Sequence, residues 1–280
     1  MSNTKVILEG FTFLESPRWR DGKLWFCDFF DHRVLAMDAG GQAETVCEVP
    51  HQPSGLGWLP DGRMLVVSMI DRRVLRLEAD GLVEHADLSN LATFHCNDMV
   101  VDDQGRAYVG NFGSDLAAGG MPDPAVLMLV TPDGQSRVVA EDLLFPNGSV
   151  ITSDGRTLIV GESFGARMTA FDIAPDGSLS NRRLWAQLEA AIPDGCCMDA
   201  EGALWVASPP TREVLRVREG GETTHRISTD QMAIACMLGG DDRRTLYILT
   251  APSVDRPECE TARSAQIEAL EVEIPGAGLP

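Results

Sequence analysis

The sequence has 280 residues, of which 44% are hydrophobic, and a formal net charge of −19 at pH 7. A chain of this size can bury a large core, and no linker divides it, so we expect a single domain spanning residues 1–280. The acidic balance argues against nucleic acid or an anionic membrane surface as a partner, because both would repel the protein.

The N-terminal residues, MSNTKVILEG, lack the basic start and the apolar run of a signal peptide. No later stretch approaches the ~20 apolar residues that a membrane-spanning helix needs. We therefore expect a cytoplasmic protein with no membrane partner. The sequence leaves its oligomeric state open.

A glycine-centred turn recurs six times along the chain. The glycines are Gly22, Gly62, Gly105, Gly155, Gly202 and Gly240. Their spacing is that of a four-stranded β-propeller blade. Asp-Gly between apolar runs, as at most of these turns, is also a strong hairpin signal. The pattern predicts an all-β fold: a six-bladed β-propeller with four-stranded antiparallel blades.

The apolar runs after these turns, such as residues 65–67 and 204–206, predict strands buried between neighbouring blades. Residues 181–191 read either as a helical turn or as an outer strand and loop. The sixth unit lacks an obvious last strand, because the chain ends soon after residues 269–274. We expect the N-terminal segment Lys5–Leu8 to supply that strand and close the ring.

A polar residue precedes five of the six turn glycines by seven or eight positions. These residues are Glu15, Ser54, Asn97, Asn147 and Asp194. Equivalent positions of a repeat lie on one ring around the axis, so their side chains should meet at one end of the channel. Asn, Asp and Glu beside Pro and Gly most often form turns, but four of them in register indicate an oxygen-lined site for Ca²⁺, Mg²⁺ or Mn²⁺. Ser54 is the weak member, better suited to a wall or a turn.

Two further features bear on the site. Residues 113–124 form a long connection, rich in glycine, that the strand order places above the ring as either a lid or an idle insertion. Seven cysteines without CxxC spacing indicate reduced, buried thiols rather than disulfides or a zinc site.

Four motifs follow one another in an order that is quite specific. They are Glu15-Ser16-Pro17-Arg18-Trp19, Asn97-Asp98, Pro146-Asn147-Gly148 and Pro193-Asp194-Gly195. In these motifs the chain resembles, over nearly its whole length, the family of senescence marker protein (regucalcin), gluconolactonase and luciferin-regenerating enzyme. The resemblance implies a six-bladed propeller that holds one divalent ion and hydrolyses lactones. It also implies Glu15, Asn147 and Asp194 as metal ligands, Asn97 as a ligand or substrate contact, and Asp194 as the general base.

The chain departs from the family at His95, where sugar-lactonase members tend to carry arginine. A neutral imidazole offers fewer donors than a guanidinium group. Phe94, Phe112, Phe145 and Phe164 also come near loop ends on the same face. We therefore expect His95 and Phe112 to contact an apolar or aromatic lactone. The alternative is that His95 faces away from the site.

The sequence as a whole favours a metal-dependent lactonase or related carboxylic-ester hydrolase that acts on a small-molecule lactone or ester. Its cofactor would be one divalent ion, Ca²⁺, Mg²⁺, Mn²⁺, Fe²⁺ or Zn²⁺. Gly-x-Ser-x-Gly is absent, so no nucleophilic serine is indicated. The alternatives are an organophosphate hydrolase on the same site, and a non-enzymatic propeller that binds a ligand or calcium. A mere binding platform would not need acidic and amide residues in register.

Overall fold

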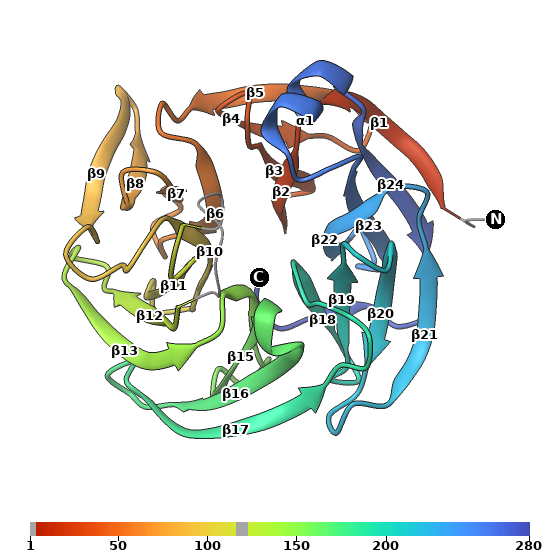
Figure 1. Ribbon diagram of the computed structural model, residues 1–280. Coiled ribbons are helices and arrows are strands. Elements are labelled where there is room, and N and C mark those ends of the chain that lie inside the picture. The colour runs from red at the N-terminus through yellow and green to blue at the C-terminus, as the bar shows by residue number, and fades with distance from the viewer. Residues whose placement is uncertain (1–3, 116–122) are drawn as a thin grey trace.

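Six blades of antiparallel strands surround a central channel in the computed structural model, which describes residues 4–115 and 123–280 (Figure 1). The predicted six-bladed propeller is confirmed. The expected lid, residues 113–124, falls largely outside the described residues.

The strands of each blade follow one another from the channel outward. The first blade comprises β2 (Leu14–Arg20), β3 (Lys23–Asp28), β4 (Arg33–Met37) and β5 (Ala43–Glu48). The second comprises β6 (Pro53–Trp58), β7 (Met64–Ser68), β8 (Arg73–Glu78) and β9 (Gly81–Asp87). The third comprises β10 (Cys96–Val101), β11 (Ala107–Asn111), β12 (Ala125–Val130) and β13 (Ser136–Leu143).

The remaining blades repeat this order. The fourth comprises β14 (Pro146–Ile151), β15 (Thr157–Glu162), β16 (Arg167–Ile173) and β17 (Leu179–Gln187). The fifth comprises β18 (Cys196–Asp199), β19 (Leu204–Ser208), β20 (Glu213–Val217) and β21 (Thr223–Ser228). The sixth comprises β22 (Met232–Gly239), β23 (Thr245–Ala251), β24 (Ala265–Glu271) and β1 (Lys5–Phe11).

Burial falls from the channel outward within a blade. Every residue of β7, β10 and β14 is buried, whereas β5 on the outside has no buried residue. The inner strands lie between neighbouring blades and therefore carry continuous apolar runs. The polar residues that interrupt these runs are the ones that need an explanation.

The N-terminal strand closes the ring, as expected. β1 pairs antiparallel with β24, from Lys5 opposite Ala269 to Phe11 opposite Ala265. Phe11 also packs edge-on against Phe26 of the first blade, with ring centroids 5.6 Å apart. The start of the chain thus completes the last blade, covers its edge and joins it to the first blade.

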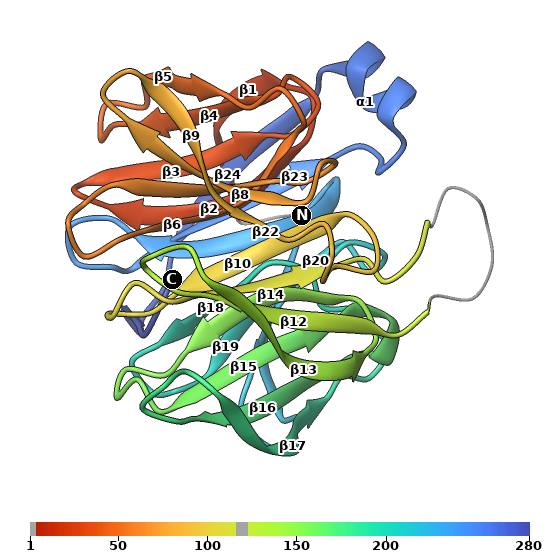
Figure 2. The same cartoon turned by 90° about the vertical axis from the view of Figure 1, so that its left-hand side faces the viewer.

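The chain also contains features that the sequence did not predict. The helical alternative for residues 181–191 is wrong, because β17 extends to Gln187. The α-helix within the described residues is α1 (Arg256–Ala262), capped by the Asp255 side chain, and it projects from one end of the propeller (Figure 2). At the other end β25 (Gly276–Ala277) pairs with β18, and Leu279 bridges to Ile151.

All seven cysteines are free, and six of them are buried, as the sequence indicated. No helix in the described part of the chain is long and apolar enough to cross a membrane. The cytoplasmic location stays a prediction.

Ring closure can be tested within β1. Phe11 is 8% exposed and Val6 is 43% exposed. We expect Phe11→Ala to lower the free energy of unfolding by about 3 kcal/mol, because it leaves a cavity beneath Phe26, and Val6→Ala to change it by less than about 0.5 kcal/mol. Urea unfolding measures both variants. Equal effects would contradict a closing role for β1.

Candidate metal centre

The predicted ring residues lie at the starts of the inner strands. Glu15, Asn97 and Asn147 are each the second residue of β2, β10 and β14, and Asp194 comes two residues before β18. Inner strands of successive blades run in the same direction, so these four residues share one end of the channel. Ser54 holds the same position in β6 and is fully buried, which suits a wall residue.

Glycines allow these strand starts to approach closely. A Cβ added to Gly148 would lie 2.4 Å from the main-chain oxygen of Asp194, and one added to Gly195 would lie 2.3 Å from the Cβ of Ala235. Both distances are shorter than any van der Waals contact. Gly148 and Gly195, which follow Asn147 and Asp194, therefore let these two strand starts approach each other.

Hydrogen bonds link the ring residues across blades. Asn97 Nδ2 donates to the main-chain oxygen of Pro146 over 3.4 Å, and Asn147 Nδ2 donates to Ser163 Oγ over 3.2 Å. Ser163 Oγ in turn donates to the oxygen of Pro193 over 2.7 Å. The third, fourth and fifth blades are thereby connected around the site. Ser163 had no signal in the sequence, because its role depends on a short 3-10 turn at Ser163–Gly165.

The two carboxylates of the ring lie in an unfavourable electrostatic environment. Burial, followed by the charges of Asp194 and Asp98, raises the pKa of Glu15 well above its usual value. Burial and the charge of Asp98 raise the pKa of Asp194 to about 7, although hydrogen bonding with Asn147 opposes the rise. Asp194 is half-buried as a residue, but its Oδ1 is shielded from water and has no hydrogen-bond partner.

Five of the other six buried carboxylates in the described residues are neutralised by arginine, and the sixth, Glu268, accepts hydrogen bonds from Thr250 and Gln266 instead. The pairs are Asp28 with Arg33 at 2.9 Å, Asp98 with Arg18 at 2.7 Å, Asp102 with Arg106 at 2.6 Å, Glu162 with Arg167 at 2.8 Å, and Asp199 with Arg216 at 2.6 Å. Within the described residues neither Glu15 nor Asp194 forms an ion pair; Glu15 Oε2 accepts only the N–H of Ser16, over 3.0 Å. An uncompensated buried charge is costly, so these two side chains fit a cation that they would share.

The donor set limits how such a cation could be held. No group of three or more His, Cys, Asp or Glu side chains with metal-binding geometry occurs in residues 4–115 and 123–280. An ion between Glu15 and Asp194 would therefore also need the neutral oxygens of Asn97 and Asn147. Such a mixed set of hard donors suits Ca²⁺, Mg²⁺ or Mn²⁺.

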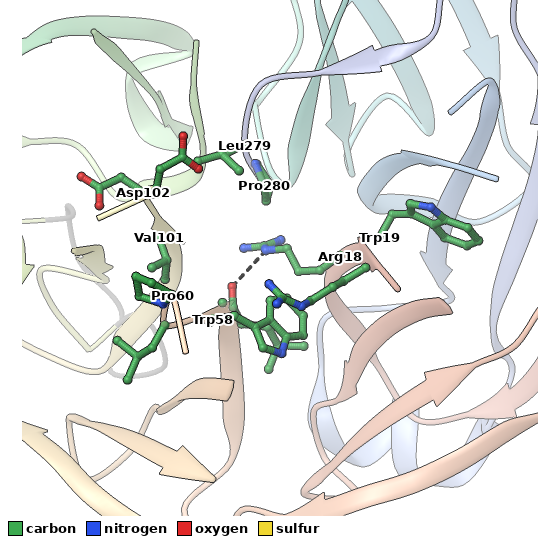
Figure 3. A pocket seen from close by; sticks show the side chains of 13 residues that line it. Arg18, Trp19, Trp58, Pro60, Val101, Asp102, Leu279 and Pro280 are labelled. Carbon is green, nitrogen blue, oxygen red and sulfur yellow. Dashed lines mark hydrogen bonds between the residues drawn. The ribbon is translucent and has the colours of Figure 1, made fainter. Parts of the chain in front are cut away.

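The sequence did not indicate that Arg18 crosses the channel beneath the ring. Its Nε donates to the oxygen of Leu56 over 3.0 Å (Figure 3). Its Nη2 donates to Asp98 Oδ1 over 2.7 Å, so one side chain of the first blade contacts the second and third. Ser16 Oγ donates to the same Asp98 oxygen over 3.1 Å. The sequence motifs that contain Arg18 and Asp98 are evident separately. Their contact is not, because the two residues lie 80 positions apart.

A pocket lies at the opposite end of the channel, away from the ring. It is lined by Arg18, Trp58, Asp102 and the chain end, Leu279 and Pro280 (Figure 3). This is the end at which the inner strands turn into the second strands, and the C-terminal tail lies across it. The C-terminal tail thus covers this end of the channel, and the predicted site lies at the opposite end.

Aromatic side chains lie in the loops at the end of the channel that carries Asn97 and Asn147. His95 stacks on Phe94 with centroids 4.0 Å apart and meets Phe112 edge-on at 6.2 Å. Its imidazole is half-buried, and burial lowers its pKa. Contact with Phe112 argues against the alternative in which His95 faces away as an isolated surface residue. The proposed contact with substrate stays a prediction.

Gly148 provides a test of the close approach. Gly148→Ala should lower the free energy of unfolding by about 3 kcal/mol, because its Cβ would overlap main-chain atoms that cannot move aside. The matched control is Gly40→Ala, whose Cβ would meet only the Asp38 side chain. Thermal melts of the two variants measure the difference. Equal stability of both would show that the blades have room at the strand starts.

Known proteins share this architecture. Luciferin-regenerating enzyme superposes with a TM-score of 0.83 at 18% identity, covering 99% of this chain and 98% of its own. A calcium-binding protein, regucalcin, from Agrobacterium tumefaciens gives 0.82 at 18% identity over 100% and 97%. A gluconolactonase from Xanthomonas campestris gives 0.76 at 22% identity over 100% and 90%. These likenesses establish the fold.

Sequence comparison identifies the family. Regucalcin from Danio rerio is 29% identical over 256 residues, which cover 85% of this chain and 82% of the relative. Regucalcin from Gallus gallus is 26% identical over 271 residues, which cover 90% and 88%. The model of the SMP-30/gluconolactonase/LRE-like region matches residues 13–252. The chain therefore belongs to the SMP-30/gluconolactonase/LRE-like family.

Proposed function

We propose that this protein is a metal-dependent hydrolase that opens the ring of a small-molecule lactone. Its family supports a lactonase-like activity. One divalent cation would be held by the carboxylates of Glu15 and Asp194 and by the amide oxygens of Asn147 and Asn97. The observation that carries the proposal is the pair of carboxylates, Glu15 and Asp194, which two blades contribute, whose pKa values are raised by burial, and which form no ion pair within the described residues.

A divalent cation held by these residues would supply Lewis-acid chemistry, polarising the lactone carbonyl and stabilising the charge that develops on its oxygen. Asp194 is the general base. Asp194 is only half-buried, so an attacking water can reach its carboxylate and give up a proton to it.

The reaction transfers that proton from the water to the leaving group. The water oxygen bonds to the carbonyl carbon, the ring C–O bond breaks, and Asp194 returns the proton to the departing ring oxygen. The product is an open-chain hydroxy acid. Asn97 either completes the ligand set or contacts the substrate, and Ser163 orients Asn147 through its hydrogen bond.

Asp194→Asn tests the assigned base. The variant keeps the shape of the side chain but cannot accept the proton, so kcat/KM on lactones should fall by at least about 100-fold. The assay uses a panel of lactones and metal-stripped protein to which Ca²⁺, Mg²⁺, Mn²⁺, Fe²⁺ and Zn²⁺ are added back separately.

The matched control is Glu268→Gln, because Glu268 is a buried carboxylate of β24 that bonds to Thr250 and Gln266 away from the channel. This variant should keep full activity. Full activity in Asp194→Asn would exclude Asp194 as the base, and an inactive wild type with every lactone and metal would refute the proposed function.

Glu15→Gln tests the cation site without an activity assay. A metal that binds only the folded protein stabilises it by about 2.7 kcal/mol at a free concentration of 100 times Kd. We expect the variant to lose at least about 1.4 kcal/mol of this stabilisation, equivalent to tenfold weaker binding. Thermal melts across a metal titration measure it.

The metal-free state provides the internal control. Without metal the Glu15→Gln variant should melt no lower than wild type, because it removes a buried charge that lacks a cationic partner. An undiminished metal shift in the variant would remove Glu15 from the ligand set.

A further inference from the structure

Five aromatic rings form a continuous row beside the ring residues. Phe94, His95, Phe112, Phe145 and Phe164 contact one another in this order, with centroid separations of 4.0, 6.2, 4.6 and 5.2 Å. The five residues come from four separate loops of the third and fourth blades. We refer to them as the aromatic row.

The row is fixed to the candidate metal centre through the backbone. His95 lies two residues before Asn97, and Phe145 lies two residues before Asn147. The N–H of Phe112 donates to the oxygen of His95 over 2.9 Å, and the N–H of Ser163 donates to the oxygen of Phe145 over 3.1 Å. The rings therefore keep a set position relative to the two carboxamides.

Phe145 adopts a backbone conformation that is unfavourable for its residue type. Its φ of 60° lies in the left-handed region, which costs a non-glycine residue about 1–2 kcal/mol. The conformation places its ring between those of Phe112 and Phe164. Strain of this kind commonly marks a functional position.

Apolar exposure is concentrated at the same mouth of the channel. Seven large hydrophobic residues of the described part are exposed, and four of them lie in loops at the metal end: Ile70, Phe164, Ile192 and Val254. Phe164, at the end of the row, is 44% exposed. The other three lie on outer strands of the blades. The four residues come from four separate loops around this mouth, and Phe164 is the one that belongs to the aromatic row.

We propose that the aromatic row binds the organic part of the substrate and selects a lactone that carries a fused or attached aromatic ring. This inference rests on the proposed function. The row offers ring faces and edges with a single imidazole as its side-chain hydrogen-bonding group, so it matches an aromatic substituent. A polyhydroxylated lactone would lose hydration of its hydroxyl groups there without gaining equivalent hydrogen bonds.

The test compares two lactones that share a six-membered ring. Dihydrocoumarin carries a fused aromatic ring and δ-valerolactone does not; glucono-δ-lactone serves as the hydroxylated case. Metal-loaded wild type should prefer dihydrocoumarin. Phe164→Ala and Phe112→Ala should each lower kcat/KM for dihydrocoumarin by about tenfold, mainly through KM, and leave δ-valerolactone nearly unchanged.

Two further variants separate binding from folding. Phe164→Leu keeps apolar bulk but removes the ring, so it should show the same selective loss. Leu184→Ala alters an outer-strand residue that is 60% exposed and should behave as wild type. Equal losses on both lactones, or a wild-type preference for glucono-δ-lactone, would overturn the inference while leaving lactonase activity standing.

A binding measurement separates the inference from the proposed function. Dihydroquinolinone and δ-valerolactam are the lactam counterparts of the two lactones and resist hydrolysis. Calorimetry should find dihydroquinolinone bound about tenfold more tightly, and the difference should disappear in Phe164→Ala. Equal affinities in wild type would refute the aromatic row as a recognition surface even if every lactone were hydrolysed.

Discussion

Closure of the ring by β1 and β24 is the interaction on which the rest of the structure depends. The candidate centre draws Glu15 from the first blade and Asp194 from the fifth, and the sixth blade lies between them. That blade contributes no residue to the centre, but it holds its neighbours at the right separation. Ala235 of β22, for example, leaves room only for glycine at position 195. The strand that completes the sixth blade thus supports a site drawn from the first, third, fourth and fifth blades.

Carboxylates that stabilise the fold of this protein differ from those of the candidate site in whether an arginine neutralises them. Asp199 and Glu162 are neutralised by arginines of their own blades, so each pair can form when that blade folds. Glu15 and Asp194 come together only after the blades have assembled, and the charge of Asp194 adds to the cost of ionising Glu15. Such an arrangement weakens the metal-free fold and favours a bound cation. The lack of a cationic partner is therefore a stronger indication of a cation site than the presence of acidic residues alone.

The sequence predicted the blades well, because hairpin signals are local and repeat six times. Closure was predictable too, since the last unit lacked a strand. The tail and α1 were not: Gly276–Ala277 is too short to show a period, and α1 has seven residues, although Asp255 and Pro257 mark its start. The contact between Arg18 and Asp98 could not be predicted from the sequence for another reason. It crosses the channel between non-adjacent blades, and no local pattern encodes which side chains meet on the axis.

The third and fourth blades carry both kinds of side chain that the proposed reaction needs. In each, a carboxamide begins the inner strand and a ring lies two residues earlier, in the connecting loop. In the fourth blade Asn147 is confined by the strand and by the neighbouring Gly148, so few residue types fit there. The loop position lies outside the strand, although its main-chain oxygen accepts a hydrogen bond in both blades. Substitution at these loop positions can therefore change what is bound while the strands keep the reacting groups in place.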